Sequence, residues 1–319
     1  MQLYAVLIDA LDLLKHHWRS FFPGAFLTTL ILIPCAWSGQ VINDQDRAWA
    51  KNVLKEEASL APVKAANTVA VLNFRNTTDN QELDPFQKGV AIMLITDLAK
   101  IKQLTLVERT RIQALQDEMT LAQSGLVEQT ATSKTGKLLG AHFVIGGDFL
   151  KGGKKPLKLS SDVLNITRPE AMKKIFSEGE VGALLTLEKE IAFKIVAILN
   201  IELSSKEKEA LKEPLSTNMR ALAYLFQGVD LSDKGKYHTA KRCYDKAIQL
   251  DPGLGMARQA AAELIHLKLA REPAKTDAIL NRTQERTTTI REQGFDNRLK
   301  QSVTESPSVI ETTDIHVKW

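Results

Sequence analysis

The sequence predicts an α/β protein, with a mixed sheet and packed helices in three layers, followed by a small all-helical module. Three observations predict it. A strand, a helix and a second strand follow one another within residues 68–108. Three further strands and a long amphipathic helix occupy residues 142–203. From residue 214 to residue 270 the apolar residues recur at helical spacing.

Composition narrows the classes of function. The 319 residues leave room for about two domains, and apolar and charged fractions of 44% and 25% are ordinary for a globular protein. The formal net charge of +4 comes from dispersed Lys and Arg, so we expect no nucleic-acid partner. Two cysteines and six scattered histidines give neither a disulfide framework nor a metal site, and no cofactor is expected.

Residues 1–38 carry the pattern of an export signal, in which basic residues precede the apolar run Phe21–Trp37. Its core, Ala25–Ile33, is short for a membrane span of about 20 residues, which favours a secretory signal over a permanent anchor. Two ways of processing this signal are possible. Cleavage after Ser38 would release the protein, whereas lipid on Cys35 would tether it, although Pro34 departs from the usual lipoprotein box. We expect a periplasmic protein, with or without an outer-membrane tether.

A polar spacer at 39–64 precedes the first domain, which is predicted at residues 65–205. A buried strand at Val69–Phe74 begins it, and Asp84 is expected to cap a helix at 84–100. The remaining predicted elements are, in order, a strand at 104–108, a helix closed by Gly125, a short helix at 132–140, strands at 142–150, 157–167 and 172–178, and a closing helix at 184–203. This alternation predicts the mixed sheet.

The glycine-rich stretch at 140–155 raises the alternative of nucleotide chemistry. Gly147 and Gly152 have the spacing of a phosphate-binding loop, but Gly153 stands where that loop requires lysine. The segment GGDF also resembles the signature of cyclic-dinucleotide synthases without its second carboxylate. We interpret the stretch as a strand and its turn, and we keep a nucleotide-binding or signalling enzyme centred on Gly146–Lys155 as an alternative.

Five segments within residues 68–203 resemble the CsgG family of curli-secretion lipoproteins. They are VAVLNF, LITDLAK, LTLVERTRIQALQDEM, LAQSGLV and KLLGAHFVIGGDFL, in this order. The first and last are also similar to strands of the amino-terminal domain of the TolB family. The resemblance implies an envelope domain that binds proteins, has no catalytic centre and forms rings. In keeping with this, we interpret Glu108 and Arg109 as a salt-bridged junction.

The chain departs from CsgG where that family inserts the two long hairpins of its pore. Here KGGKKP reads as a tight turn, and the closing helix follows FSEGE within a few residues. A membrane-crossing hairpin needs about nine to eleven residues per strand. We therefore expect no CsgG-like pore, and an outer-membrane secretion channel is kept as a second alternative.

A helical module is predicted at residues 214–270, and its residues 221–252, ALAYLFQGVDLSDKGKYHTAKRCYDKAIQLDP, resemble a tetratricopeptide repeat, in which two antiparallel helices pack through small and aromatic residues. The residues expected at this packing are Tyr224, Gly228, Leu231, Tyr237, Ala240, Tyr244, Ala247 and Pro252, of which the proline is expected to start the next helix. On the other side of the first helix, Leu222, Leu225 and Val229 are predicted to form a peptide groove.

A single repeat cannot bury a core, so the module is expected to lean on the first domain, on its own tail or on a partner. The tail at 271–319 is polar and is expected to be helical to disordered. Uncovered strand edges in the first domain predict self-association there. The sequence therefore predicts a non-enzymatic envelope scaffold that assembles other proteins, with a link to the secretion of extracellular fibres among its expected roles.

Overall fold

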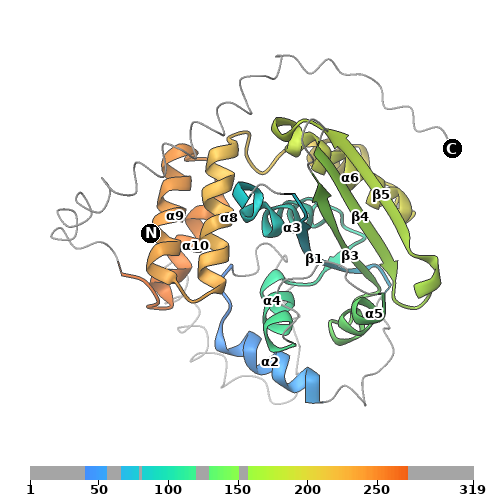
Figure 1. Ribbon diagram of the computed structural model, residues 1–319, viewed down its shortest axis with the longest axis horizontal. Coiled ribbons are helices and arrows are strands. Elements are labelled where there is room, and N and C mark those ends of the chain that lie inside the picture. The colour runs from blue at the N-terminus through green and yellow to red at the C-terminus, as the bar shows by residue number, and fades with distance from the viewer. Residues whose placement is uncertain (1–39, 56–65, 79–80, 120–128, 151–156, 272–319) are drawn as a thin grey trace, which may run out of the picture. The chain divides into compact units, whose positions relative to one another are not determined.

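The computed structural model describes residues 40–55, 66–78, 81–119, 129–150 and 157–271 (Figure 1). The chain divides into two compact units, Met1–Trp37 and Ser38–Trp319, and all described residues belong to the second. The predicted export signal with Cys35, the helix end at Gly125, the turn at 151–156 and the tail from residue 272 lie outside the described residues.

A five-stranded mixed sheet forms the centre of the described unit, in the order β2-β1-β3-β4-β5. The strands are β1 (Thr68–Asn76), β2 (Thr105–Leu106), β3 (Phe143–Leu150), β4 (Leu157–Asn165) and β5 (Lys173–Gly179). β1 runs parallel to β2 and β3, whereas β4 and β5 continue the sheet antiparallel. The predicted α/β class and the predicted strands are confirmed.

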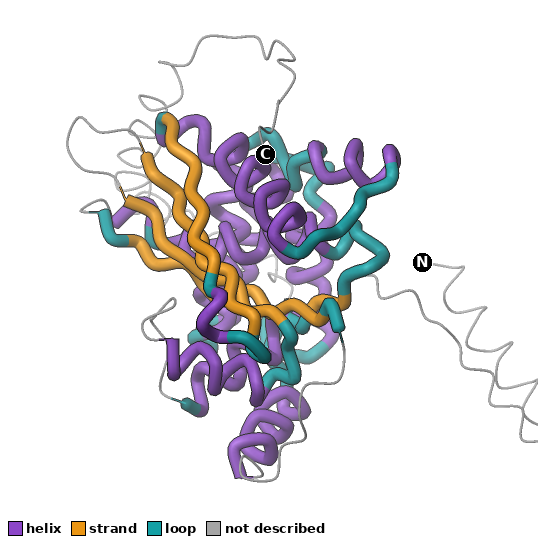
Figure 2. Tube along the Cα trace, turned by 90° about the vertical axis from the view of Figure 1, so that its right-hand side faces the viewer, coloured by secondary structure: helices purple, strands orange, loops and turns teal. Residues whose placement is uncertain are grey.

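Helices lie on both faces of this sheet (Figure 2). They are α2 (Asp44–Lys55), α3 (Pro85–Leu98), α4 (Arg109–Glu118), α5 (Gln129–Leu138), α6 (Leu184–Ile198), α7 (Ser205–Lys212), α8 (Met219–Asp233), α9 (Tyr237–Leu250) and α10 (Gly255–His266), with short 3-10 helices at Gln81–Leu83, Pro169–Ala171 and Val181–Ala183.

Alternate residues of the strands supply the two cores. On one face, Val69 and Ile145 pack with apolar residues of α3 and α6. On the other face, Ala70 and Val144 pack with residues of α4 and α5, and α2 lies against α4. Because the first part of β1 is buried on both faces, its sequence is a continuous apolar run from Val69 to Leu72, as expected for an inner parallel strand.

Two helix ends differ from the sequence prediction. Asp84 precedes α3, but its carboxylate does not cap the helix and instead accepts from Asn76 Nδ2 at 2.8 Å. α6 ends at Ile198 because Asn200 adopts a left-handed φ of 53°. A separate helix, α7, then starts after Ser204, which forms a capping box with Glu207.

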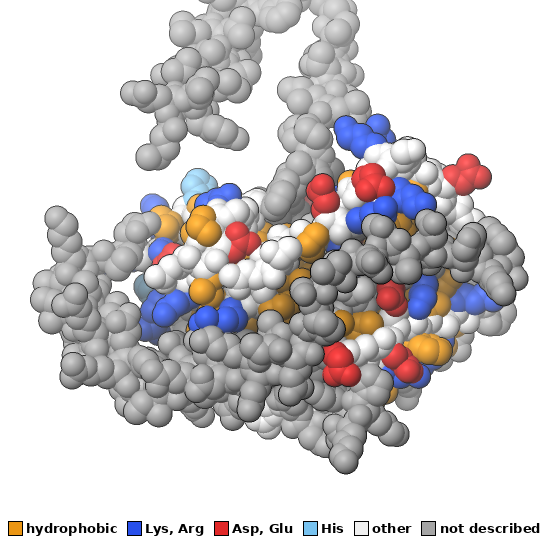
Figure 3. Space-filling view, turned by 90° about the horizontal axis from the view of Figure 1, so that it is seen from above, with side chains coloured by type: hydrophobic (Ala, Val, Ile, Leu, Met, Phe, Trp, Pro, Cys, Tyr) orange, Lys and Arg blue, Asp and Glu red, His pale blue; other side chains and the backbone are white. Residues whose placement is uncertain are grey.

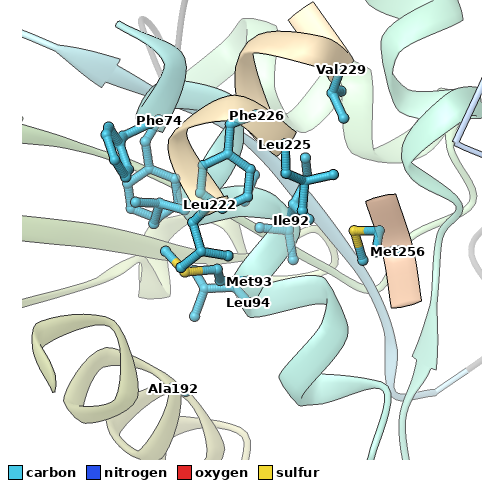
Figure 4. Close-up of a cluster of buried hydrophobic side chains, with 14 of the residues drawn as sticks. Phe74, Ile92, Met93, Leu94, Ala192, Leu222, Leu225, Phe226, Val229 and Met256 are labelled. Atoms are coloured by element: carbon cyan, nitrogen blue, oxygen red, sulfur yellow. The ribbon is translucent and has the colours of Figure 1, made fainter. Parts of the chain in front are cut away.

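The helical module shares its core with the sheet domain. Side chains of α8 form one cluster with those of α3, joined by Met256 of α10 (Figure 4). Phe226 meets Phe86 edge to face with ring centroids 5.7 Å apart. Gly89 permits this approach, since a Cβ there would lie 2.3 Å from Phe226 Cδ2. Of the three expected supports for the module, the structure shows the first domain.

The predicted peptide groove is wrong. Leu222, Leu225 and Val229 each have a relative exposure of 0%, and they point into the cluster shared with α3 (Figure 4). This side of α8 is covered by α3 of the same chain. An apolar helix face can pack against a neighbouring helix as well as against a peptide.

The α8–α9 pair has the close packing expected of the repeat. A Cβ on Gly228 would lie 2.5 Å from Tyr244 Cε1, so only glycine fits there. Buried residues of this pair are Tyr224, Ala240, Tyr244 and Ala247, and half-buried ones are Leu231 and Tyr237. Pro252 is a correction, because it is exposed in the turn before α10, which begins at Gly255. Membership of the tetratricopeptide family stays a prediction.

Candidate protein-interaction surface

The glycine-rich stretch is an inner strand over its described part. Residues Gly146–Leu150 lie in β3, which pairs with β1 on one side and with β4 on the other. Gly147 lacks a side chain for a steric reason, since a Cβ would lie 2.0 Å from the Ser160 carbonyl oxygen. The backbone groups of this segment serve the two ladders, which leaves them unsuited to cradle a phosphate.

Asp148, the lone carboxylate of this stretch, belongs to a polar row across the sheet. Ser160 Oγ donates to Asp148 Oδ1 at 2.6 Å, and Arg75 Nη2 lies 3.5 Å from Asp148 Oδ2. The register places Arg75, Asp148, Ser160 and Phe176 opposite one another on β1, β3, β4 and β5. The carboxylate is thus engaged by its cross-strand neighbours.

Two ion pairs flank this row on the β4–β5 ladder. Lys158 Nζ lies 3.2 Å from Glu178 Oε1, and Lys174 Nζ lies 3.5 Å from Asp162 Oδ1. In each pair the two residues are register partners. Burial raises the pKa of the Asp162 carboxyl, and the Lys174 charge acts against that rise. Positive and negative side chains therefore alternate between the strands.

Exposed apolar side chains also occur on this part of the sheet. The large apolar residues that are exposed in the described part of the chain are Leu150, Met172, Phe176 and Leu267. Three of them lie in or next to β3 and β5. Phe176 is 51% exposed, and Lys158 Nζ lies 4.1 Å from the centre of its ring. We name Leu150, Lys158, Lys174, Phe176 and Glu178 the β5 surface.

The space-filling view shows where side chains of each type lie on one face of the described chain (Figure 3). Charged side chains of both signs and apolar ones lie side by side over its right-hand part, the side on which Figure 1 places the sheet. An aromatic residue surrounded by charges of both signs is typical of a protein-binding surface, since aromatic anchors supply contact area and the polar rim supplies orientation.

A second group of charges lies between α3, α4 and α8, with the side chains of Arg109 and Asp233 buried. Arg109 Nη1 donates to both carboxylate oxygens of Asp233, at 3.0 and 3.2 Å, and Arg109 Nη2 donates to the Gln40 carbonyl. Lys88 Nζ lies 2.8 Å from Asp233 Oδ2 and 3.0 Å from Asp230 Oδ1. We name Lys88, Arg109, Asp230 and Asp233 the Arg109 cluster.

The expected salt-bridged junction at Glu108 and Arg109 is present with different partners. Arg109 pairs with Asp233 of α8 and so ties the helical module to the sheet domain, whereas Glu108 pairs with Arg111 one turn along α4. Fork-shaped contact with a carboxylate is the geometry that arginine favours in buried sites.

A third cluster joins α3 and α6. Glu188 is buried, and this burial, together with the neighbouring charge of Asp97, raises the pKa of its carboxyl well above the usual range. Lys100 and Lys189 both donate to Asp97. A perturbed acid can mark a catalytic site, but this one lies between two packed helices.

Comparison with known proteins bears on the sheet domain. Residues 50–151 match the family model described as curli production assembly/transport component CsgG. This match begins in α2 and ends just after β3, so it confirms the predicted resemblance over β1, β2 and β3. Comparison with curated proteins gives no match.

Solved structures of LpoB are also similar to part of the chain. The LpoB C-terminal domain from Salmonella enterica is 18% identical, with 42% of this chain and 98% of that chain covered and a TM-score of 0.27. The NMR structure of E. coli LpoB is 16% identical, with 50% and 78% covered and a TM-score of 0.30. The LpoB C-terminal domain from Escherichia coli is 19% identical, with 42% and 98% covered and a TM-score of 0.29.

Every helix in the described part of the chain is too short or too polar to cross a lipid bilayer. In the same residues, no three His, Cys, Asp or Glu side chains come together as metal ligands.

Proposed function

We propose that the chain is a non-enzymatic protein of the cell envelope that acts as an assembly component through protein–protein contact at the β5 surface. The match of residues 50–151 to a family named for curli assembly and transport supports the envelope setting. The observation that carries the proposal is the exposed Phe176 between two cross-strand ion pairs.

Burial of an exposed aromatic ring is a large source of binding free energy, and a partner gains it most readily where the ring is already held in place. Phe176 is held by its strand and by Lys158 over its ring. The ion pairs on both sides would orient the partner more than they would add to affinity.

The charged side chains in and near the glycine-rich stretch and at the start of α4 have structural partners, which supports a binding role. Asp148 accepts from Ser160, and Arg109 is engaged by Asp233. Isothermal titration with nucleotides and Mg²⁺ tests the enzyme alternative centred on Gly146–Lys155. Micromolar binding that Asp148→Ala abolishes would replace our proposal with that alternative.

Export and tethering belong to the same proposal, and mass spectrometry of the mature N-terminus tests them. Lipid on Cys35 would mean a protein held at the periplasmic face of the outer membrane, and a new N-terminus after Ser38 would mean a free periplasmic one. An intact Met1 in the mature protein would overturn the envelope setting.

Site-specific photo-cross-linking in the producing cells tests the surface itself. A photoreactive amino acid in place of Phe176 is expected to form adducts with protein, because the side chain lies in the contact. The matched control is His238, which is exposed on α9. Adducts at His238 with none at Phe176 would move the binding site to the helical module and overturn the proposal.

A further inference from the structure

We propose that the occupant of the β5 surface is a second copy of this chain, joined through antiparallel pairing of the two β5 strands about a two-fold axis at Phe176. This inference rests on the proposed function and names the partner at the same surface.

β5 is an outer strand of the sheet and is seven residues long, whereas β2 at the other edge has two. Every second residue of an edge strand turns its N–H and C=O away from the sheet. Lys194 Nζ donates to the Phe176 carbonyl at 2.7 Å, which indicates that Phe176 is one of the outward-turned residues. The edge is thus long enough to pair, and within the described part of the chain this carbonyl is occupied by the Lys194 side chain.

Symmetry restricts the register of such a pair. Residues directly opposite each other must lie on the same face, so an axis through Phe176 places Lys174 opposite Glu178 of the partner subunit. An axis moved by two residues along β5 would place Lys174 opposite the partner's Lys174, or Glu178 opposite the partner's Glu178. The register at Phe176 therefore brings opposite charges together, whereas an axis at Lys174 or at Glu178 places like charges opposite each other.

The ion pairs inside each copy extend this complementarity into a row. Across the joint the order is Lys158, Glu178, the partner subunit's Lys174 and the partner subunit's Asp162, with alternating sign. Within one copy the measured contacts are 3.2 Å for Lys158 with Glu178 and 3.5 Å for Lys174 with Asp162. The two-fold axis repeats the row on the other side of Phe176.

The centre of the joint is apolar. Phe176 would lie opposite Phe176 of the partner subunit, with Leu150 of each copy two strands away on the same face. The two Phe176 rings would thereby cover part of each other's exposed apolar area. Lys194 must leave the Phe176 carbonyl for the strands to pair, so Lys194→Met is expected to tighten the association.

Charge reversal tests the register, with sedimentation of the full chain as the readout. Lys174→Glu and Glu178→Lys are each expected to weaken self-association at least about tenfold, because like charges then face each other in both rows. A mixture of the two variants is expected to form the dimer again, since each row regains one positive and one negative residue. Equal association of the single variants and the wild type, or a monomeric mixture, would overturn the register.

Cysteine cross-linking gives a second, independent readout. Phe176→Cys is expected to form a disulfide-linked dimer on mild oxidation, because opposed Cα atoms of such a pair lie about 5.5 Å apart. Lys174→Cys alone is the control, since its copies would lie about 14 Å apart. A mixture of Lys174→Cys and Glu178→Cys is expected to cross-link, whereas cross-linking of Lys174→Cys alone would contradict the register.

The two proposals fail differently. Photo-adducts at Phe176 that contain another protein, from a chain that sediments as a monomer, would overturn the second copy as occupant and leave the β5 surface as a binding site. The absence of any adduct at Phe176 would overturn both.

Discussion

The Arg109 cluster and the β5 surface are both built from alternating charges, and they differ in burial. The side chains of Arg109 and Asp233 are 8% and 3% exposed, whereas those of Lys174 and Glu178 are 60% and 47% exposed. A buried ion pair that loses one member leaves a charge in apolar surroundings, but an exposed one exchanges its partner for water. The first arrangement holds two parts of the fold together, and the second leaves its charges available for recognition.

The largest expected effect is on the Arg109 cluster. Asp233→Ala leaves Arg109 and Lys88 without their shared carboxylate, and the free energy of unfolding is expected to fall by about 3–5 kcal/mol in urea denaturation. Glu209→Ala removes a carboxylate from an exposed pair with Lys212 and serves as the control. Its expected change is under about 1 kcal/mol. Similar losses in the two variants would mean that the cluster does not join the module to the sheet.

A slightly smaller effect is expected where the helical module meets α3. Leu225→Ala removes a buried side chain, which is expected to cost about 2–5 kcal/mol in the same measurement. Leu267→Ala is the matched control, because that leucine is exposed after α10. A Leu225→Ala variant as stable as the control would mean that this side chain is not buried against α3, and it would favour the peptide groove predicted from the sequence.

The buried acid Glu188 gives a pH dependence with a defined sign. Its pKa is raised in the folded state, so the folded protein binds more protons than the unfolded one between the unfolded pKa of about 4.3 and the raised value. Stability is therefore expected to fall as pH rises through this window, by about 1.4 kcal/mol for each unit of the rise in pKa.

Urea midpoints at several pH values, for the wild type and for Glu188→Gln, measure this dependence. The variant is expected to lose most of the fall in stability, because the amide cannot ionise. Glu209→Gln, at an exposed position, should keep it. An unchanged profile in Glu188→Gln would assign the pH dependence to other groups.

The smallest effect on stability is expected at the β5 surface. Lys174→Ala and Glu178→Ala should each change the free energy of unfolding by less than about 1 kcal/mol, since the side chain removed is itself exposed in both cases. The same variants should weaken self-association in sedimentation. A large loss of stability together with unchanged association would show that these pairs serve the fold.

Local patterns made much of the fold predictable. The apolar run of β1 and the helical spacing of α3 depend on residues close in the chain. The start of α7 is also a local pattern, since Ser204 and Glu207 form the common capping box, but the predicted elements include no helix there. Pro252 was misassigned because proline suits the first turn of a helix and a preceding turn alike.

Contacts between distant segments were not predictable in the same way. The apolar face at Leu222, Leu225 and Val229 is identical in sequence whether a peptide or α3 covers it. Arg109 was recognised as a junction residue, but its partner Asp233 lies 124 residues further along the chain. The rows of the β5 surface depend on strand register, which no short motif in β4 or β5 specifies.

Hydrogen–deuterium exchange of the full chain at low and high protein concentration compares the two regions in one measurement. The account predicts that backbone amides of β5, around Phe176, exchange quickly when the protein is dilute and slowly when it is concentrated. Amides of α8, around Leu225, should exchange slowly at both concentrations. Rapid exchange in α8 would contradict its packing against α3, and exchange in β5 that does not depend on concentration would contradict the pairing of β5 with a second copy.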